Sequence, residues 1–226
     1  MQVQKKWIYV LLQEGFACMC TSMGSKWASY QGTHSMLNFN SPRLPDLGHM
    51  YIPHHPFAPF LADGISLILL VSFLFLCATC PRKSSLCCLF FTIHSRLLFL
   101  RLVLILATIL PSPVLECRSP TAFEKCLPCQ DIHDLIPTFS TFYCNDLMFS
   151  GHTMTNTLVV GFWALSPQTS LSSSRMMGVL LAMGGMALLS ARWHYSIDIL
   201  VAMYCTGTVL ALYRTEIEAV WKQKLQ

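Results

Sequence analysis

Charged side chains are scarce in this chain of 226 residues, and their scarcity argues against most soluble folds. Only 12% of the residues are Asp, Glu, Lys or Arg, whereas 54% are hydrophobic; a soluble domain carries about 25% charged residues. The formal net charge is only +4, and no basic stripe interleaved with aromatic side chains is present, so nucleic acid is not an expected partner. This composition favours a protein of the lipid bilayer.

A second CxxC pair in a polar segment is also lacking. Cys126 and Cys129 have the CxxC spacing of a redox or zinc site. The other CxxC, Cys77–Cys80, lies in an apolar run, where free cysteine behaves as a small hydrophobic residue, and the nearby His133 does not complete a metal site. We therefore expect neither a metal nor another cofactor. The polar loop that holds this pair, with Cys117 and Cys144, is expected to contain a disulfide bond or free thiols.

Long apolar segments predict an all-α, polytopic membrane helix bundle with five clear spans. A helix rises 1.5 Å per residue and needs about 20 apolar residues to cross the hydrocarbon. The third and fourth segments are short, so their ends should extend into flanking polar residues. The predicted spans are Phe57–Cys80, Leu86–Leu110, Thr153–Leu165, Met176–Ser190 and Ile197–Tyr213.

Residues 1–56 are expected to be a polar, irregular N-terminal segment. Trp7–Leu12 is apolar, but the polar Gln13–Gly15 interrupts it, so it predicts a doubtful first span rather than a clear one. It lacks the continuous apolar region and cleavage site of a signal peptide. The prolines from Pro42 to Pro59 then predict an extended loop. The remainder divides into a membrane domain, residues 57–213, and a cytosolic tail, residues 214–226.

Lys and Arg gather at alternate ends of the predicted spans. If every span crosses, one side of the membrane holds most of them, and that side should be the cytosol. The opposite, lumenal or exoplasmic side then holds His152 and His194. The sequence does not distinguish among the Golgi, the endoplasmic reticulum and the plasma membrane. The residues on the predicted cytosolic side are Arg82, Lys83, Arg175, Arg214, Lys222 and Lys224.

His194 and Asp198 form the sharpest pattern in the sequence. Positions i and i+4 share a helix face, with Cβ atoms roughly 5–6 Å apart. A carboxylate there can accept one imidazole N–H and leave the other nitrogen free for nucleophilic attack. An equally strong alternative is a His–Asp pair that only stabilises the helix end. An Asp at the end of a membrane span is costly without a function.

A second histidine begins another predicted helix. Ser150 is a candidate N-cap, and it places His152 in the first helical turn, where free backbone N–H groups and the helix dipole favour a phosphate. Arg101 and Arg96 are candidate phosphate ligands, although either could instead neutralise a buried acid or reach the head-group layer. Asp146 could orient His152, shape its loop or act as a cap.

The segments Cys144–Thr153 and His194–Asp198 resemble the sphingomyelin synthase family, which includes the ceramide phosphoethanolamine and inositol phosphorylceramide synthases. This family belongs to the wider type 2 phosphatidic acid phosphatase superfamily. Pro42–Asp46 looks like its proline-rich loop, and Arg96 or Arg101 followed by Leu110–Pro113 is similar to its basic third-span region. Two features depart from the family's pattern. Asn145 replaces a residue that is usually Gly, and the first of the family's six spans is only weakly apolar here.

The resemblance implies an enzyme that moves a phospho-head group from a glycerophospholipid to the primary hydroxyl of ceramide, releasing diacylglycerol. His194 would form a phosphohistidine, Asp198 would orient it, and His152 would act as acid and then base. The implied partners are ceramide, the donor lipid, the membrane and a second copy of the chain. Choline, ethanolamine and inositol remain open as the donor head group.

Two alternatives remain. A lipid phosphate phosphatase uses the same histidines with water as acceptor, but the KxxxxxxRP motif of that class is missing here. A non-catalytic membrane protein that binds ceramide is favoured by the doubtful first span and opposed by the complete set of His152, His194 and Asp198.

Overall fold

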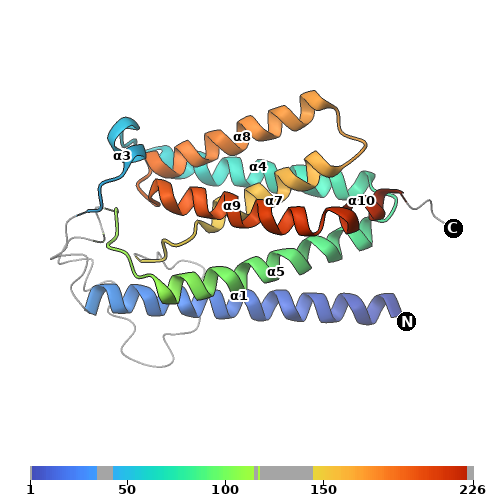
Figure 1. Ribbon diagram of the computed structural model, residues 1–226, viewed down its shortest axis with the longest axis horizontal. Coiled ribbons are helices and arrows are strands. Elements are labelled where there is room, and N and C mark those ends of the chain that lie inside the picture. Colours follow the sequence, from blue (N-terminus) through green and yellow to red (C-terminus); the bar gives the residue numbers. More distant parts are fainter. Residues whose placement is uncertain (1, 35–42, 115–116, 118–144, 223–226) are drawn as a thin grey trace.

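The computed structural model describes residues 2–34, 43–114, 117 and 145–222, and this part of the chain is an all-helical bundle without strands. The all-α prediction is confirmed. Figure 1 shows the long helices side by side along one axis. The helices are α1 (Gln2–His34), α3 (Leu47–Tyr51), α4 (Ala58–Thr79), α5 (Lys83–Ala107), α7 (Gly151–Leu165), α8 (Leu171–Ser190), α9 (Ser196–Leu212) and α10 (Arg214–Lys222).

Three helices of the described part, α4, α5 and α8, are long and apolar enough to cross a membrane, and α9 with α10 would form a fourth candidate bent by 55°. The chain is therefore a multi-pass membrane protein, although the predicted number of five spans is not established. Helix α7 has only 15 residues. Within the predicted cytosolic tail, α10 packs against the bundle, because its Ile217 and Trp221 are buried.

The boundaries of two spans differ from those expected. Helix α5 ends at Ala107, three residues before Leu110, because Thr108 adopts an extended backbone conformation ahead of Pro111. Helix α8 begins five residues before Met176, where the hydroxyl oxygen of Ser170 accepts a hydrogen bond from the backbone N–H of Ser173. This N-cap satisfies one of the free amides of the first turn, so the apolar span gains a polar first turn.

The N-terminal segment was expected to be irregular, and this expectation is wrong for residues 2–34. They form one helix of 33 residues that continues through Gln13–Gly15. The carboxylate of Glu14 is paired with His94 and accepts a hydrogen bond from Ser95, both on α5. The polar interruption that argued against a helix is thus matched by polar residues of a neighbouring helix.

Small residues allow α1 to lie close to its neighbours. Ala17 and Ala28 are fully buried, and a Cβ atom at Gly24 would clash with the side chain of Leu102 on α5. Such small faces let helix backbones approach closely in membranes. Figure 1 shows α1 along the outer side of α5.

Successive long helices run in opposite directions, so the same end of the bundle collects the starts of α4, α7 and α9 and the last turns of α1, α5 and α8 (Figure 1). Aromatic rings hold the interior together: Phe73 of α4 stacks on Phe90 of α5 at 4.1 Å, and Phe162 of α7 contacts both edge-on. This packed interior fixes the three helices that carry most of the candidate site.

Candidate active site

The start of α7 presents His152 at the end of the bundle. Ser150 is the N-cap, as predicted: its hydroxyl oxygen accepts hydrogen bonds from the backbone N–H and the hydroxyl of Thr153. His152 lies in the first turn, with its side chain 36% exposed, and its Nε2 atom lies 3.1 Å from Oδ1 of Asp63 on α4. The sequence analysis did not predict this contact.

His194 and Asp198 approach each other, but not from one helix. His194 precedes α9, which begins at Ser196, so the predicted shared helix face is wrong in detail. Nδ1 of His194 lies 3.7 Å from Oδ2 of Asp198, which is longer than a hydrogen bond. That oxygen accepts a 2.8 Å hydrogen bond from the backbone N–H of Tyr195 instead.

The His–Asp pair is nevertheless withdrawn from solvent and has spare hydrogen-bonding capacity. Asp198 is fully buried and His194 is 6% exposed. Within the described residues, neither Nδ1 of His194 nor Oδ1 of Asp198 has a hydrogen-bond partner. Unpaired buried polar atoms are rare, and catalytic hydrogen bonds are often long before substrate binds. The geometry therefore suits a pair that closes during a reaction.

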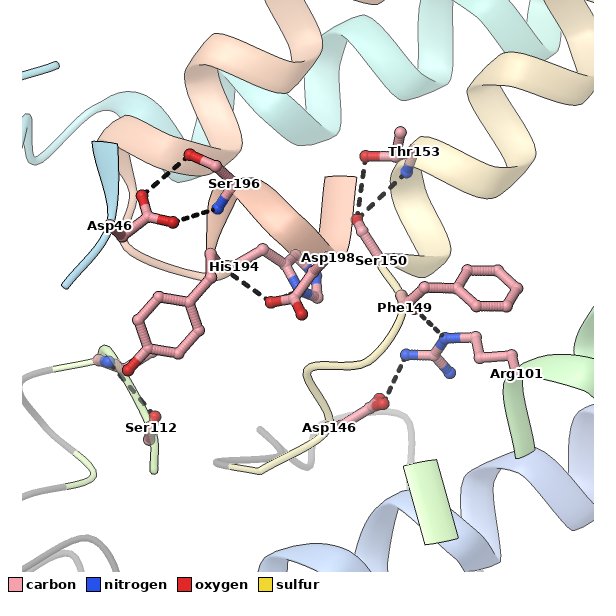
Figure 2. A network of polar contacts seen from close by, with 12 residues as sticks. Asp46, Arg101, Ser112, Asp146, Phe149, Ser150, Thr153, His194, Ser196 and Asp198 are labelled. Atoms are coloured by element: carbon pink, nitrogen blue, oxygen red, sulfur yellow. Dashed lines mark hydrogen bonds and ion pairs between the residues drawn. The ribbon is translucent and has the colours of Figure 1, made fainter. Parts of the chain in front are cut away.

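The proline-rich loop holds the segment that carries His194. The Asp46 carboxylate accepts hydrogen bonds from the backbone N–H and the hydroxyl of Ser196, at 2.7 and 2.9 Å, as Figure 2 shows. It also accepts one from the backbone N–H of His49. Burial acts to raise the pKa of Asp46, but these hydrogen bonds outweigh burial and hold the pKa below its ordinary value.

His49 reaches the candidate nucleophile directly. Its Nε2–H donates a 2.9 Å hydrogen bond to the backbone carbonyl oxygen of His194. Burial lowers the pKa of His49, although this hydrogen bond and the charge of Asp46 oppose the shift. Arg192 has a positive φ of 60°, which is uncommon without glycine, and its guanidinium donates to the carbonyls of His49 and Ile52. The sequence carried no signal for these contacts.

Arg101 brings a buried cation to the start of α7. Its Nε–H donates to the carbonyl oxygen of Phe149 at 2.8 Å, and its guanidinium forms a 2.6 Å ion pair with Asp146, both visible in Figure 2. A Cβ atom at Gly151 would lie 3.4 Å from the guanidinium carbon, so the bare glycine backbone leaves room beside it. Asp146 therefore pairs with Arg101 rather than orienting His152.

Arg96, the other candidate phosphate ligand, lies elsewhere. It is exposed, and its guanidinium carbon is 5.2 Å from the ring centroid of Tyr213. It does not line the cavity described below, so the structure separates Arg96 from the remaining site residues.

A cavity of about 810 Å³ joins these elements. Both candidate catalytic histidines line it, together with Arg101 and Asp146, whereas Ser150 and Asp198 do not line it. Leucines of α4 and α5 supply much of its apolar surface. Its polar lining comprises Ser66, His94, Arg101, Asp146, His152, Thr155, Asn156 and His194.

Asn145, which replaces the usual glycine, has a structural role in this chain. Its amide donates a 2.7 Å hydrogen bond to the carbonyl of Leu110, and its backbone N–H donates to the hydroxyl of Ser29 on α1. Its side chain fills the space over Gly32, where a Cβ atom would clash with it. Among the described non-glycine residues only Arg192 has a positive φ, so Asn145 does not adopt the left-handed conformation that favours glycine.

Of the four loop cysteines, Cys117 is disulfide-bonded. Cys126, Cys129 and Cys144 lie outside the described residues, as does His133.

Known proteins are similar to the part of the chain that holds this site. Residues 143–215 match the family described as PAP2 superfamily C-terminal, and this segment contains both candidate catalytic histidines. A phosphatidylethanolamine:ceramide ethanolaminephosphotransferase from Trypanosoma brucei brucei is 32% identical over 143 residues, or 60% of this chain and 43% of the relative.

Two further relatives are named as inositolphosphotransferases that act on ceramide. A phosphatidylinositol:ceramide inositolphosphotransferase from Leishmania major is 32% identical over 141 residues, covering 60% of this chain and 41% of the relative. Phosphatidylinositol:ceramide inositolphosphotransferase 3 from Arabidopsis thaliana is 26% identical over 115 residues, covering 49% and 39%. The chain thus spans less than half the length of each of these relatives. Residues 143–215 are thus similar to the PAP2 superfamily, and the chain is similar to proteins named as ceramide phosphotransferases.

Proposed function

We propose that this chain transfers a phospho-head group from a glycerophospholipid to the primary hydroxyl of ceramide. The observation that carries the proposal is that His152 and His194, from two separate elements, line one cavity beside the buried cation of Arg101. Two histidines can divide the roles of nucleophile and acid–base group. The relatives named as ceramide ethanolamine- and inositolphosphotransferases favour ceramide as the acceptor.

The first half-reaction is an attack by His194 on the donor phosphorus. Nδ1 faces Asp198, so Nε2 is the nitrogen assigned to the attack. A P–N bond forms as the P–O bond to diacylglycerol breaks, and His152 gives a proton to the departing oxygen. The product is a phosphohistidine that retains the head group, together with free diacylglycerol.

The second half-reaction returns the proton and frees the histidine. His152 accepts the proton of the ceramide primary hydroxyl, whose oxygen attacks the phosphorus while the P–N bond breaks. The guanidinium of Arg101 would lie beside the phosphate oxygens, where a buried cation stabilises developing negative charge more strongly than in water. Asp198 would stabilise the imidazolium of His194 between the two steps.

We assign the site to the lumenal or exoplasmic membrane face. Arg82 is the N-cap of α5 and Lys83 its first residue, Arg175 is the fifth residue of α8, and Arg214 and Lys222 belong to α10. These cations gather at the end of the bundle opposite the site, and the side richer in Lys and Arg is normally cytosolic.

Reconstitution of the purified chain into liposomes with labelled ceramide and one donor phospholipid at a time tests this function. We expect a labelled sphingophospholipid and an equal amount of diacylglycerol with at least one donor. Head-group phosphate released to water without a ceramide product would identify a phosphatase instead. Ceramide binding without turnover of any donor would identify a non-catalytic protein, and either result would refute the transfer.

A further inference from the structure

A buried acid–imidazole pair between α1 and α5 borders the cavity. Oε1 of Glu14 lies 2.6 Å from Nδ1 of His94, and both side chains are only 14% exposed. The hydroxyl of Ser95 donates to Oε2 of Glu14 at 2.7 Å. Ionisable groups within a membrane bundle are costly and usually mark function, yet the transfer chemistry above uses neither residue.

The contacts of this pair define what His94 offers to the cavity. An ionised carboxylate only accepts hydrogen bonds, so Nδ1 of His94 carries the hydrogen that Glu14 accepts. In the tautomer with a single hydrogen on Nδ1, the other ring nitrogen, Nε2, is an acceptor. It lies 3.1 Å from the hydroxyl oxygen of Thr155 on α7, and both His94 and Thr155 line the cavity. In this tautomer, Nε2 accepts the hydrogen of the Thr155 hydroxyl, and a donor group of a bound lipid can take the place of that hydroxyl.

This acceptor lies about one helical turn deeper in the bundle than the proposed chemistry. Thr155 follows His152 by three residues, which is about 4.5 Å along the helix axis. At a similar level, the amide of Asn156 donates to the hydroxyl of Ser66 on α4. Leu67, Leu70 and Leu98 also line the cavity. A narrow band of polar side chains thus lies next to the proposed phosphate position, and apolar side chains line the cavity around it.

Ceramide carries hydrogen-bond donors close to its reacting primary hydroxyl, and they are complementary to an acceptor nitrogen. The two carbons that follow its primary alcohol carry an amide N–H and a secondary hydroxyl, both hydrogen-bond donors. Diacylglycerol, which the first half-reaction would leave in the same cavity, carries ester groups that only accept. An acceptor nitrogen can therefore hold ceramide and leave diacylglycerol unpaired, and sites that hydrogen-bond a substrate strongly reject analogues that lack the group.

Resting on the proposed function, we infer that His94, oriented by Glu14, is the specificity residue that selects ceramide as acceptor by binding its amide N–H or secondary hydroxyl. The alternative role for the pair is to hold α1 against α5. The two roles predict different kinetics. Only in the first does the effect of His94 on kcat/KM depend on which hydrogen-bond donor groups ceramide or its analogue carries.

The experiment compares three acceptors in liposomes: ceramide, ceramide methylated at the amide nitrogen, and ceramide lacking the secondary hydroxyl. The full chain is tested as wild type, as His94→Gln, and as the double variant Glu14→Leu with His94→Phe. The double variant removes both polar partners together, which avoids leaving a buried carboxylate unpaired. In His94→Gln, the amide N–H can donate to Glu14 and the amide oxygen can still accept from the ligand.

We expect wild type to prefer ceramide over at least one analogue by about tenfold to a hundredfold in kcat/KM, as an unpaired buried polar group implies. The double variant should lose that preference because its kcat/KM falls for ceramide alone, and His94→Gln should retain most of it. An equal fall of kcat/KM for all three acceptors, or an unchanged preference, would refute the inference while leaving the transfer reaction intact. A wild-type chain that uses no ceramide at all would instead refute the proposed function, and this inference with it.

Discussion

The imidazole of His49 donates a 2.9 Å hydrogen bond through Nε2 to the backbone carbonyl oxygen of His194. The two residues are 145 positions apart, and the contact joins the proline-rich loop to the residue that we assign as nucleophile. Asp46 and Arg192 add hydrogen bonds on either side of it. The loop therefore fixes the backbone of His194, whereas Asp198 lies beside its ring.

His49 is expected to position His194 during catalysis. His49→Leu removes the donor at similar volume and leaves a carbonyl unpaired, so kcat should fall about tenfold to a hundredfold while KM for the donor lipid changes little. His49→Gln, whose amide nitrogen can reach the same carbonyl, should recover most of kcat. Steady-state kinetics in mixed micelles measure both constants. Equal kcat for the leucine and glutamine variants would show that the hydrogen bond does not matter.

The low pKa of Asp46 predicts a loss of stability in acid. A carboxyl group whose pKa is lower in the folded state than the unfolded value of about 3.9 stabilises the fold above that value, and this contribution disappears as the pH falls through the folded pKa. Thermal unfolding of the detergent-solubilised protein should therefore show a Tm advantage of wild type over Asp46→Asn at pH 6. The advantage should shrink steadily below about pH 4. An advantage that is independent of pH would contradict the assignment of the titration to Asp46.

Much of this arrangement follows from sequence patterns, and the remainder depends on partners distant in the chain. The N-cap at Ser150 was predictable because capping is local, and the apolar spans were predictable from composition. The helix through Gln13–Gly15 was not, since Glu14 is paired with His94 and Ser95, which lie 80 and 81 positions away. The pairing of His152 with Asp63 across 89 positions was missed for the same reason.

Helical periodicity alone also could not show which of the two arginines of α5 borders the cavity. Arg96 and Arg101 point to different sides of one helix, and only the packing of α7 and α9 shows which side borders the cavity. Arg101 meets Asp146, while Arg96 lies over Tyr213.

Gly32 and Asn145 are expected to compensate for each other. A Cβ atom at Gly32 would clash with the side chain of Asn145, so Gly32→Ala should destabilise the protein by about 1–3 kcal/mol, as overpacking usually does. Asn145→Gly removes the obstructing side chain, and the double variant should regain part of the stability lost by Gly32→Ala. Denaturation of the four proteins in one detergent provides the double-mutant cycle. Strictly additive losses would show that the two residues do not meet.

The proposed orientation predicts which loops receive glycans. An acceptor sequence inserted near Leu127 should be modified in microsomes, because that loop is assigned to the lumen. An acceptor inserted near Ser173, at the opposite end of the bundle, should remain unmodified. A shift in mobility that is removed by a glycosidase reports the result, and the reverse pattern would invert the assigned topology.

Asp198 is expected to act through His194 rather than independently. Asp198→Asn keeps an oxygen that can accept from the backbone N–H of Tyr195, so the start of α9 should remain capped. It removes the negative charge that would stabilise an imidazolium, and its amide can reverse the tautomer of His194. The analogous change in a serine-protease triad lowered kcat by about 10⁴. We therefore expect Asp198→Asn to lose most of its transfer activity while the protein stays folded and inserted.

Non-additivity provides the decisive test of this pair. His194→Ala should abolish transfer and any phosphohistidine trapped from labelled donor lipid, since no other group is assigned to hold the phosphoryl intermediate. Residues that act as one catalytic unit are strongly non-additive, so adding Asp198→Asn to His194→Ala should cost almost nothing further in any residual rate. Ser150→Ala is a useful control because it removes the hydroxyl that caps α7 but keeps the backbone N–H that donates to the carbonyl of Asp198, and its effect on stability should appear in every background. If the losses from His194→Ala and Asp198→Asn simply multiply, the carboxylate at 3.7 Å from Nδ1 supports only the local fold. The charge that stabilises the imidazolium must then come from another residue.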